Sequence, residues 1–519
     1  IKGGSYNPSN PTDYEIERLG TSGTDYLKTS DISKASDQTF YLDARVNYDR
    51  QFNLHHVTGM LMYMQREYRS SVLPERNQGF SGRFTYDYGQ RYLVELNFGY
   101  NGTERLAKKE RFEFFPAVSL GWVISNEKFF EPMTKYIDNL KIRGSYGLVG
   151  SDETGLSAGA QHFLYIDQVS LNNIGFTTGV DMNYTLYGPL VTNYAVVNGG
   201  WERVKKLDIG IDLELFRQLT ITADYFNEKR YNILLHREAW PESLGYYTAK
   251  PWSNKGKVDN WGIELSVNWR KEFTKDLYVD FRGNFTYTEN KYVNLDEPVY
   301  PYVWKTSTGK PLSRTTGYIA QGLFSSQEEI DNSPTQNLGS TVKPGDIKYR
   351  DVNGDGKIDG SDQVMISPYG TTPRIQYGLG MNVTYKKFDF GVFFNGSAKR
   401  TIMISGISPF GQSDYNVMQF IADDYWSESN PNPNAKYPRL GLTSSQTANN
   451  TVASTYWMRN GNFIRFKTLE LGYKFKYGRV YLNGDNIAVF SPFKLWDPEL
   501  SWNAYPLQRT FNIGVQLNF

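Results

Sequence analysis

Residues 261–269 read Trp-Gly-Ile-Glu-Leu-Ser-Val-Asn-Trp, with an apolar or aromatic side chain at every second position. A period of two places the apolar residues on one face of a β-strand and the small or polar residues on the other. The apolar stripe begins and ends on tryptophan, which matches the aromatic girdles at the two interfaces of a membrane barrel. The stretch therefore predicts a strand with one face toward lipid.

The same alternation recurs along most of the chain. We count about fifteen strands, at residues 40–49, 51–65, 80–88, 91–101, 112–123, 139–148, 205–215, 218–228, 260–271, 276–289, 375–386, 387–397, 462–475, 478–486 and 509–519. Tight turns are expected near Arg50, Gly89, Arg217, Thr274, Lys386 and Lys476. Long polar loops are expected at residues 149–204, 229–259, 290–374, 398–461 and 487–508. Short turns at one end and long loops at the other predict an all-β transmembrane antiparallel barrel. A soluble sandwich or propeller also alternates, but rarely gathers every long loop at one end.

The composition agrees with a membrane barrel. The chain has 519 residues, of which 16% are aromatic, and its mean hydropathy is −0.54. The chain has no run of 18 apolar residues, so its sequence predicts no transmembrane helix. Lys and Arg number 56 against 55 Asp and Glu, so a nucleic-acid partner is disfavoured. Cysteine is absent, which excludes disulfides and thiolate chemistry from this chain.

The end of the chain and the strand count bear on completeness. Residues 511–519 form an amphipathic strand that ends on phenylalanine, which resembles the C-terminal signal of bacterial outer-membrane barrels. Fifteen strands cannot close an even-stranded barrel, and an open edge in lipid would leave backbone groups unpaired. We therefore expect seven further strands in an N-terminal part, to give twenty-two. Residues 1–39 are expected to be an extracellular loop or an incomplete start, and 40–519 the C-terminal part of the barrel.

Residues 351–362 have the composition of a calcium loop. They read Asp-Val-Asn-Gly-Asp-Gly-Lys-Ile-Asp-Gly-Ser-Asp, with oxygen-bearing side chains at positions 1, 3, 5, 9 and 12 and the turn glycine at position 6. We predict a calcium site at Asp351, Asn353, Asp355, Lys357, Asp359 and Asp362. Position 12 is aspartate rather than the usual bidentate glutamate. The alternatives are another divalent cation, or an Asx-rich turn that holds no ion.

Aromatic residues in the long loops are the candidates for substrate contact. Rings that could stack on sugars or peptide side chains are Trp240, Trp252, Tyr302, Trp304 and Trp426, and the alternative is packing within the loops or against a partner protein. Carboxylates on the polar face of the strands are expected to point into the barrel: Glu95, Asp208, Asp212, Glu214, Asp224, Glu264 and Asp280. We expect no enzyme, because the sequence shows no convincing Ser/His or Asp/His constellation.

Several blocks, spread in order over about 400 residues, resemble a known family. They are Asn139-Leu140-Lys141-Ile142-Arg143-Gly144-Ser145-Tyr146-Gly147, Asn254-Lys255-Gly256-Lys257-Val258-Asp259-Asn260-Trp261-Gly262-Ile263-Glu264, Pro344-Gly345-Asp346-Ile347-Lys348-Tyr349-Arg350 before the Asp351 loop, Tyr456-Trp457-Met458-Arg459-Asn460-Gly461-Asn462-Phe463-Ile464-Arg465, and Asn483-Gly484-Asp485-Asn486. In these blocks the chain resembles the C-terminal half of the SusC/RagA-type TonB-dependent transporters of Bacteroidetes. The family's plug, TonB box and early strands have no counterpart here.

The resemblance implies a bacterial outer-membrane protein, embedded among lipid and lipopolysaccharide. It implies a 22-stranded barrel filled by a plug, which imports oligosaccharides or peptides with energy supplied through TonB–ExbB–ExbD. A SusD-like surface lipoprotein would close over the extracellular loops, and two transporter–lid units could pair as a dimer. The alternative function is a calcium-dependent surface binding protein, an adhesin or a lectin, that does not transport.

Overall fold

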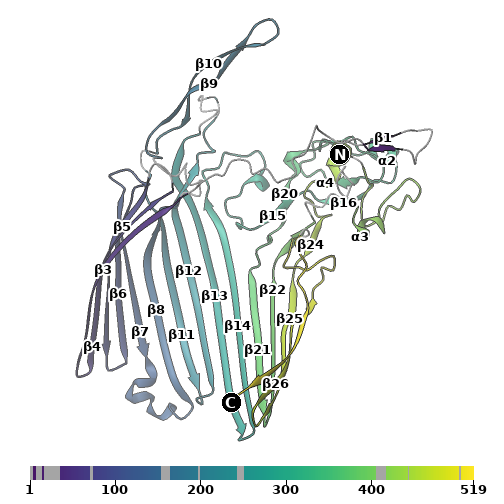
Figure 1. Ribbon diagram of the computed structural model, residues 1–519. Coiled ribbons are helices and arrows are strands. Elements are labelled where there is room, and N and C mark those ends of the chain that lie inside the picture. The colour runs from purple at the N-terminus through teal and green to yellow at the C-terminus, as the bar shows by residue number, and fades with distance from the viewer. Residues whose placement is uncertain are drawn as a thin grey trace.

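The computed structural model describes residues 4–6, 14–16, 36–70, 74–153, 164–196, 199–241, 243, 250–404, 417–441, 443–501 and 504–518. Its main feature is one antiparallel sheet of fifteen strands, which curves into a wall and follows the order of the sequence (Figure 1). The strands are β3 (Gln38–Phe52), β4 (His55–Arg69), β5 (Glu75–Tyr88), β6 (Tyr92–Thr103), β7 (Phe112–Val123), β8 (Ile137–Ser151), β11 (Glu202–Leu215), β12 (Leu219–His236), β13 (Trp252–Thr274), β14 (Leu277–Asn294), β21 (Ile375–Tyr385), β22 (Phe388–Ala398), β25 (Phe463–Phe475), β26 (Gly478–Phe490) and β27 (Thr510–Leu517).

Each of the fifteen expected strands corresponds to one strand of this sheet, so the all-β barrel prediction is confirmed. The turn expected near Arg50 is wrong, because β3 continues through that residue and the chain reverses at Asn53, whose φ is 55°. Phe216 and Arg217 form another turn, with φ of 56° and 55°. Two successive left-handed residues give the type I′ geometry that matches the twist of paired strands.

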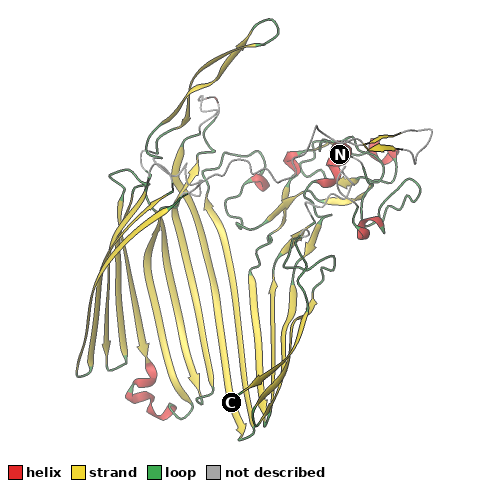
Figure 2. Ribbon diagram, in the orientation of Figure 1, coloured by secondary structure: helices red, strands yellow, loops and turns green. Residues whose placement is uncertain are grey.

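The two ends of the wall differ (Figure 2). At the end that carries the C-terminus, the chain turns in two or three residues, except for the 3-10 helices η1 (Ile124–Asn126) and η2 (Lys128–Met133) between β7 and β8. The opposite end carries the long loops. The expected loop bounds are too wide, because β12, β13 and β14 extend well beyond the alternating core of each pattern. Most of residues 1–39 lie outside the described residues, although β1 (Gly4–Tyr6) pairs with β2 (Tyr14–Ile16).

The two faces of the wall have opposite character. In β11, Ile209 and Ile211 are 48% and 44% exposed, and they share a face with Ile263 of β13 through the strand register. Polar residues alternate with them and face the other way. Such exposure of aliphatic side chains is expected where a sheet contacts lipid. Among the described residues, β3 and β27 each have one neighbour in this sheet.

The larger buried core lies outside the wall, in the loops. We define the outer-loop domain as the described parts of residues 295–374, 399–461 and 491–501 (Figure 1). Its core includes Ile347, Ile358, Ile421, Trp426 and Trp457, all at most 5% exposed. Its elements are η4 (Val303–Lys305), β15 (Thr315–Gly317), β16 (Ala320–Leu323), α2 (Gln327–Asp331), β17 (Thr335–Gln336), β18 (Ile347–Tyr349), β19 (Lys357–Ile358), η5 (Gly360–Asp362), β20 (Val364–Ser367), β23 (Thr401–Met403), α3 (Gln419–Ala422), α4 (Ser444–Thr451) and β24 (Met458–Asn460).

A buried polar network joins the first two of these loops. Asp346 is fully buried and accepts hydrogen bonds from Asn450 Nδ2 at 2.6 Å and Arg439 Nη2 at 3.1 Å. Burial raises the pKa of Asp346, while the Arg439 charge opposes the rise. Asn449 Nδ2 donates to the carbonyl of Ile347 at 2.9 Å. Because these hydrogen bonds connect residues 346–347 to residues 439–450, the network fixes the two loops against each other.

A hairpin of β9 (Gln168–Thr178) and β10 (Tyr184–Asn193) projects beyond the other loops (Figure 1). Leu171, Phe176 and Met182 on it are 80%, 66% and 67% exposed. Within the part of the chain that the structure describes, no helix is both long enough and apolar enough to cross a membrane.

Candidate functional site

The polar face of the wall carries ion pairs. Arg143 of β8 contacts three carboxylates, those of Asp208 at 3.1 Å, Asp212 at 3.3 Å and Asp224 at 2.5 Å. Arg83 pairs with Glu95 at 2.6 Å on the same face. The register places all seven carboxylates predicted to point inward on this face, which confirms that expectation. The face is therefore a hydrophilic surface with fixed charges.

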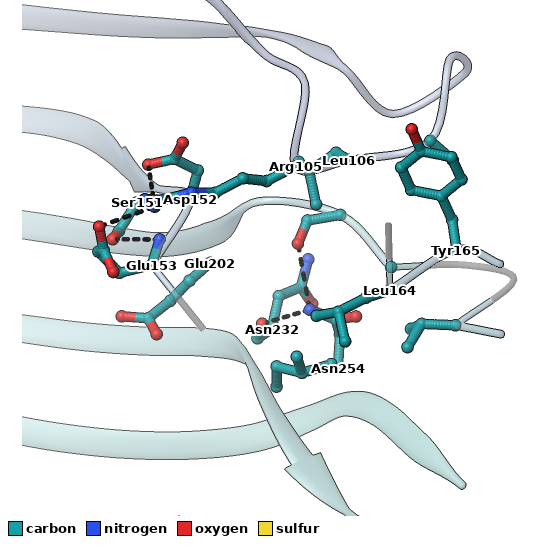
Figure 3. Close-up of a pocket in the computed structure, with 15 residues that line it drawn as sticks. Arg105, Leu106, Ser151, Asp152, Glu153, Leu164, Tyr165, Glu202, Asn232 and Asn254 are labelled. Carbon is teal, nitrogen blue, oxygen red and sulfur yellow. Dashed lines mark hydrogen bonds and ion pairs between the residues drawn. The ribbon is translucent and has the colours of Figure 1, made fainter. Parts of the chain in front are cut away.

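A small cavity lies at the long-loop end, among the ends of β8, β11, β12 and β13 and the loop after β6 (Figure 3). Arg105 crosses it and pairs with Glu153 at 2.7 Å and Glu75 at 3.1 Å. Asn254 donates to the carbonyl of Asn232 at 2.8 Å. The cavity holds only about 30 Å³, whereas small-molecule sites span about 300–1,000 Å³. These contacts tie the strand ends together and leave no room for a substrate.

A larger cavity of about 390 Å³ opens on the polar face of β14, β21, β22 and β25, below the outer-loop domain. Its lining includes Asn395 and Ser397 of β22, together with Arg400 and Phe463. Sequence reasoning missed this site. The period of two assigns Asn395 and Ser397 to the inner face, but no sequence signal shows that a cavity forms beside them.

The Asp351 loop is a tightly hydrogen-bonded turn. The Asp351 carboxylate accepts from the amides of Gly354 at 2.7 Å and Gly356 at 2.8 Å, both in left-handed conformation. Asp362 is fully buried and accepts from the amides of Val352 and Asp359. A carboxylate has about four lone-pair sites, so Asp351 keeps two for a cation.

The remaining side-chain oxygens of the predicted calcium site belong to Asn353, Asp355 and Asp359. Lys357, between Asp355 and Asp359 in the sequence, lies in β19. The Ser361 amide holds the pKa of Asp359 below its ordinary value. Asn353 and Asp355 bond to each other at 2.9 Å. Among the described residues, no three His, Cys, Asp or Glu side chains converge as metal ligands. Calcium binding stays a prediction.

The structure brings two of the predicted substrate aromatics onto this loop. Tyr302 and Trp304 stack with ring centroids 4.8 Å apart. The Tyr302 hydroxyl accepts from Asn353 Nδ2 at 3.0 Å, and Trp304 Nε1 donates to the Ser361 carbonyl at 2.8 Å. The pair therefore buttresses the Asp351 loop, a relation that the sequence did not indicate.

The other three predicted substrate aromatics lie in different environments. Trp426 is 5% exposed in the core of the outer-loop domain, which agrees with the alternative that its ring packs within the loops, and substrate contact by it stays a prediction. The rings of Trp252 and His236 are tilted by 34° to each other, with centroids 3.6 Å apart. The Arg237 guanidinium lies 5.0 Å from the ring of Trp240. Both tryptophans are partly exposed at the long-loop end, and substrate contact by them stays a prediction.

Residues 1–487 match the family described as "TonB dependent receptor-like, beta-barrel". The chain belongs to this TonB-dependent receptor family. Consistent with the SusC/RagA-type resemblance, it is similar to TonB-dependent receptor SusC of Bacteroides thetaiotaomicron, with 27% identity over 85% of this chain and 43% of the relative. It is also similar to TonB-dependent receptor P3 of Formosa agariphila, with 25% identity over 84% of this chain and 45% of the relative.

Among solved structures, that of the RagAB peptide transporter resembles the fold of this TonB-dependent receptor, with a TM-score of 0.68 and 18% identity over 93% of this chain and 55% of the other. The chain spans about half the length of the relatives that it matches. Members of the family are outer-membrane proteins, and the chain is accordingly placed in the bacterial outer membrane with its exposed aliphatic face toward lipid.

Proposed function

We propose that this chain is the barrel half of an active importer that takes up oligosaccharides or peptides with energy from TonB–ExbB–ExbD. The observation that carries the proposal is the match of residues 1–487 to a TonB-dependent receptor barrel. One structural relative is named a peptide transporter. The hydrophilic inner face supports transport of polar solutes, because it presents charged side chains such as Arg83, Glu95 and Arg143 rather than apolar ones. Import accounts for these features without any catalytic role.

The test is uptake by cells that carry the full-length transporter, with and without TonB. Cells are given radiolabelled tetrasaccharides and tetrapeptides. We expect uptake of one class to fall to the level of transporter-free cells when TonB is removed. Equal uptake in both strains would contradict energy coupling. Surface binding of a probe without any uptake would favour the alternative, an adhesin or lectin.

We propose further that a SusD-like lipoprotein closes over the long-loop end. The β9–β10 hairpin supports this partner, because a two-stranded hairpin is marginally stable alone and this one exposes Leu171, Phe176 and Met182. An exposed apolar surface of this kind is typical of a protein interface. Purification of the full transporter in mild detergent is expected to carry the lipoprotein with it, and deletion of residues 168–193 to weaken the pairing.

The Asp351 loop is proposed to bind calcium. Side-chain oxygens from Asp351, Asn353, Asp355 and Asp362, within twelve residues, suit a hard cation that prefers oxygen ligands. The loop reaches Tyr302 and Trp304 on one side and β17 on the other, through the parallel pairing of β19. A bound ion would therefore stiffen contacts between separate parts of the outer-loop domain.

Removal of calcium is expected to loosen this loop. In the full transporter, a saturating cation at about 100 times its Kd would stabilise the bound loop by about 2.7 kcal/mol. We expect hydrogen exchange of residues 351–363 to accelerate about a hundredfold with chelator, and Asp351→Ala to make exchange insensitive to chelator. Asp331→Ala, in exposed α2, is the matched control and should leave the chelator response intact. A chelator response that persists in Asp351→Ala would contradict the site.

A further inference from the structure

The cavity on β14, β21, β22 and β25 lies on the inner face of the wall. Gln376 of β21 pairs with Ser397 of β22, and Gly378 pairs with Asn395. Across the other side of β21, Gly378 pairs with Asn284 of β14. These partners all point to the same face, so amide and hydroxyl groups from three strands converge at the long-loop end.

Several polar atoms at this cavity have no partner within the described residues. Ser397 is 5% exposed, and its Oγ makes no hydrogen bond. Asn395 Oδ1 and Arg400 Nε are also buried and unpartnered. Leaving a buried polar atom unpaired costs free energy. Three such atoms beside one cavity would suit an occupant that both donates and accepts hydrogen bonds.

The charged groups at the loop side of the cavity are paired. Arg465 pairs with Asp497 at 2.7 Å and with Glu499 at 2.7 Å. Glu499 and Arg400 both line the cavity. Two guanidinium groups, those of Arg400 and Arg465, therefore face two carboxylates at the loop side of the cavity, so these four groups leave no net charge to select an ionised ligand.

Glycine keeps the floor of the cavity open. A Cβ on Gly378 would lie 2.5 Å from Asn284 Oδ1 and 3.2 Å from the ring of Phe393. Phe393 and Phe463 add apolar surface to the lining. The volume of about 390 Å³ is within the range of small-molecule sites.

We propose that this cavity is a subsite for a neutral sugar residue of an oligosaccharide on its way through the barrel. Sugar hydroxyls donate and accept hydrogen bonds, as do the amide and hydroxyl groups of Gln376, Asn395 and Ser397. The carbon-bound face of a sugar ring can pack on Phe393. A peptide terminus or an acidic sugar would require unbalanced charge. This subsite rests on the import function proposed above and assigns its substrate class.

The test uses a thiol placed in the cavity, because this sequence contains no cysteine. Ser397→Cys is isosteric, and it is introduced into the full-length transporter together with its lipoprotein. The thiol is labelled with methyl methanethiosulfonate, which is small and neutral, and the product is measured by intact mass after subtraction of the parent's labelling. Asn395→Cys is the second cavity variant. Thr341→Cys, exposed in the outer-loop domain, is the matched control for reagent access.

The probes are cellotetraose, mannotetraose, xylotetraose, tetragalacturonate and tetra-alanine. We expect a neutral tetrasaccharide to slow labelling of Ser397→Cys about tenfold when present at about ten times its Kd, and to leave Thr341→Cys unchanged. No labelling of either cavity variant, while Thr341→Cys reacts, would mean that these positions are closed to small solutes in the full transporter, and would overturn the proposal. Protection by tetra-alanine or tetragalacturonate alone, or by no probe, would also overturn it.

The labelling result is separable from transport. TonB-dependent uptake without protection of the cavity thiol would leave the importer function standing and remove the subsite. Protection without uptake of any probe would keep the subsite and remove the importer function.

Discussion

Replacement of Arg465 by methionine is expected to free the loop after β26 from the wall. The Arg465 side chain is 3% exposed and donates to Asp497 at 2.7 and 2.8 Å, to Glu499 at 2.8 Å and to Asn486. Methionine would leave Asp497 and Glu499 without the guanidinium that binds them both, and only Arg400 would then face the two carboxylates. Breaking a buried ion pair costs about 3–5 kcal/mol, and we expect about 3 kcal/mol because Glu499 is 36% exposed to water.

The measurement is hydrogen exchange of residues 491–501 in the full transporter. A loss of about 3 kcal/mol corresponds to exchange about a hundredfold faster. The triple variant Arg465→Met, Asp497→Asn, Glu499→Gln should recover most of the protection if unpaired charge is the cause. Lys436→Met, which removes an exposed pair with Asp424, is the matched control and should change little. Unchanged exchange in Arg465→Met would mean that apolar contacts alone hold this loop.

Gly345→Ala is expected to destabilise the outer-loop domain. The loss should exceed that of an alanine substitution at a glycine whose added Cβ would contact no neighbour. Gly345 has φ of +85°, which costs an alanine about 1–2 kcal/mol. Its new Cβ would also lie 2.2 Å from Cε3 of the buried Trp426 ring. Forcing an extra carbon into a packed core costs about 1–3 kcal/mol more. The readout is exchange of the Arg439 amide, which donates to the Gly345 carbonyl at 2.9 Å.

Gly309 separates the two causes. It has the same φ of +85°, but its Cβ would meet nothing within 4 Å. Gly309→Ala should therefore show only the backbone cost, measured on the amide of Lys310. The double variant Gly345→Ala, Trp426→Leu should lose less stability than the sum of the losses in the two single variants. Equal costs for Gly345→Ala and Gly309→Ala would refute the steric argument.

The wall was predictable because its chemistry is local. The alternation at residues 261–269 follows from one face meeting lipid, and the same constraint acts on each of the fifteen strands. Strand ends were less well predicted. β12, β13 and β14 run past the apolar stripe into residues such as Arg230 and Lys257, because cross-strand hydrogen bonds continue where lipid contact stops.

The candidate sites were only partly accessible to sequence reasoning. The spacing in the Asp351 loop is local and therefore visible, but its contact with Tyr302 depends on how separate loops pack. Trp426 looked like an exposed loop aromatic because nothing near it in sequence shows that Gly345 lies against its ring. The cavity beside Ser397 forms where four strands and three loops meet, and a period of two cannot predict that.

The composition of the core of the outer-loop domain limits how the loops of this domain can be redesigned. Its buried side chains come from three separate loops, for example Ile347, Trp457 and Phe493. Exchange of any one loop with a relative would leave the other two without partners for their apolar residues. A new specificity can therefore be transferred onto this barrel only if the three loops are exchanged together.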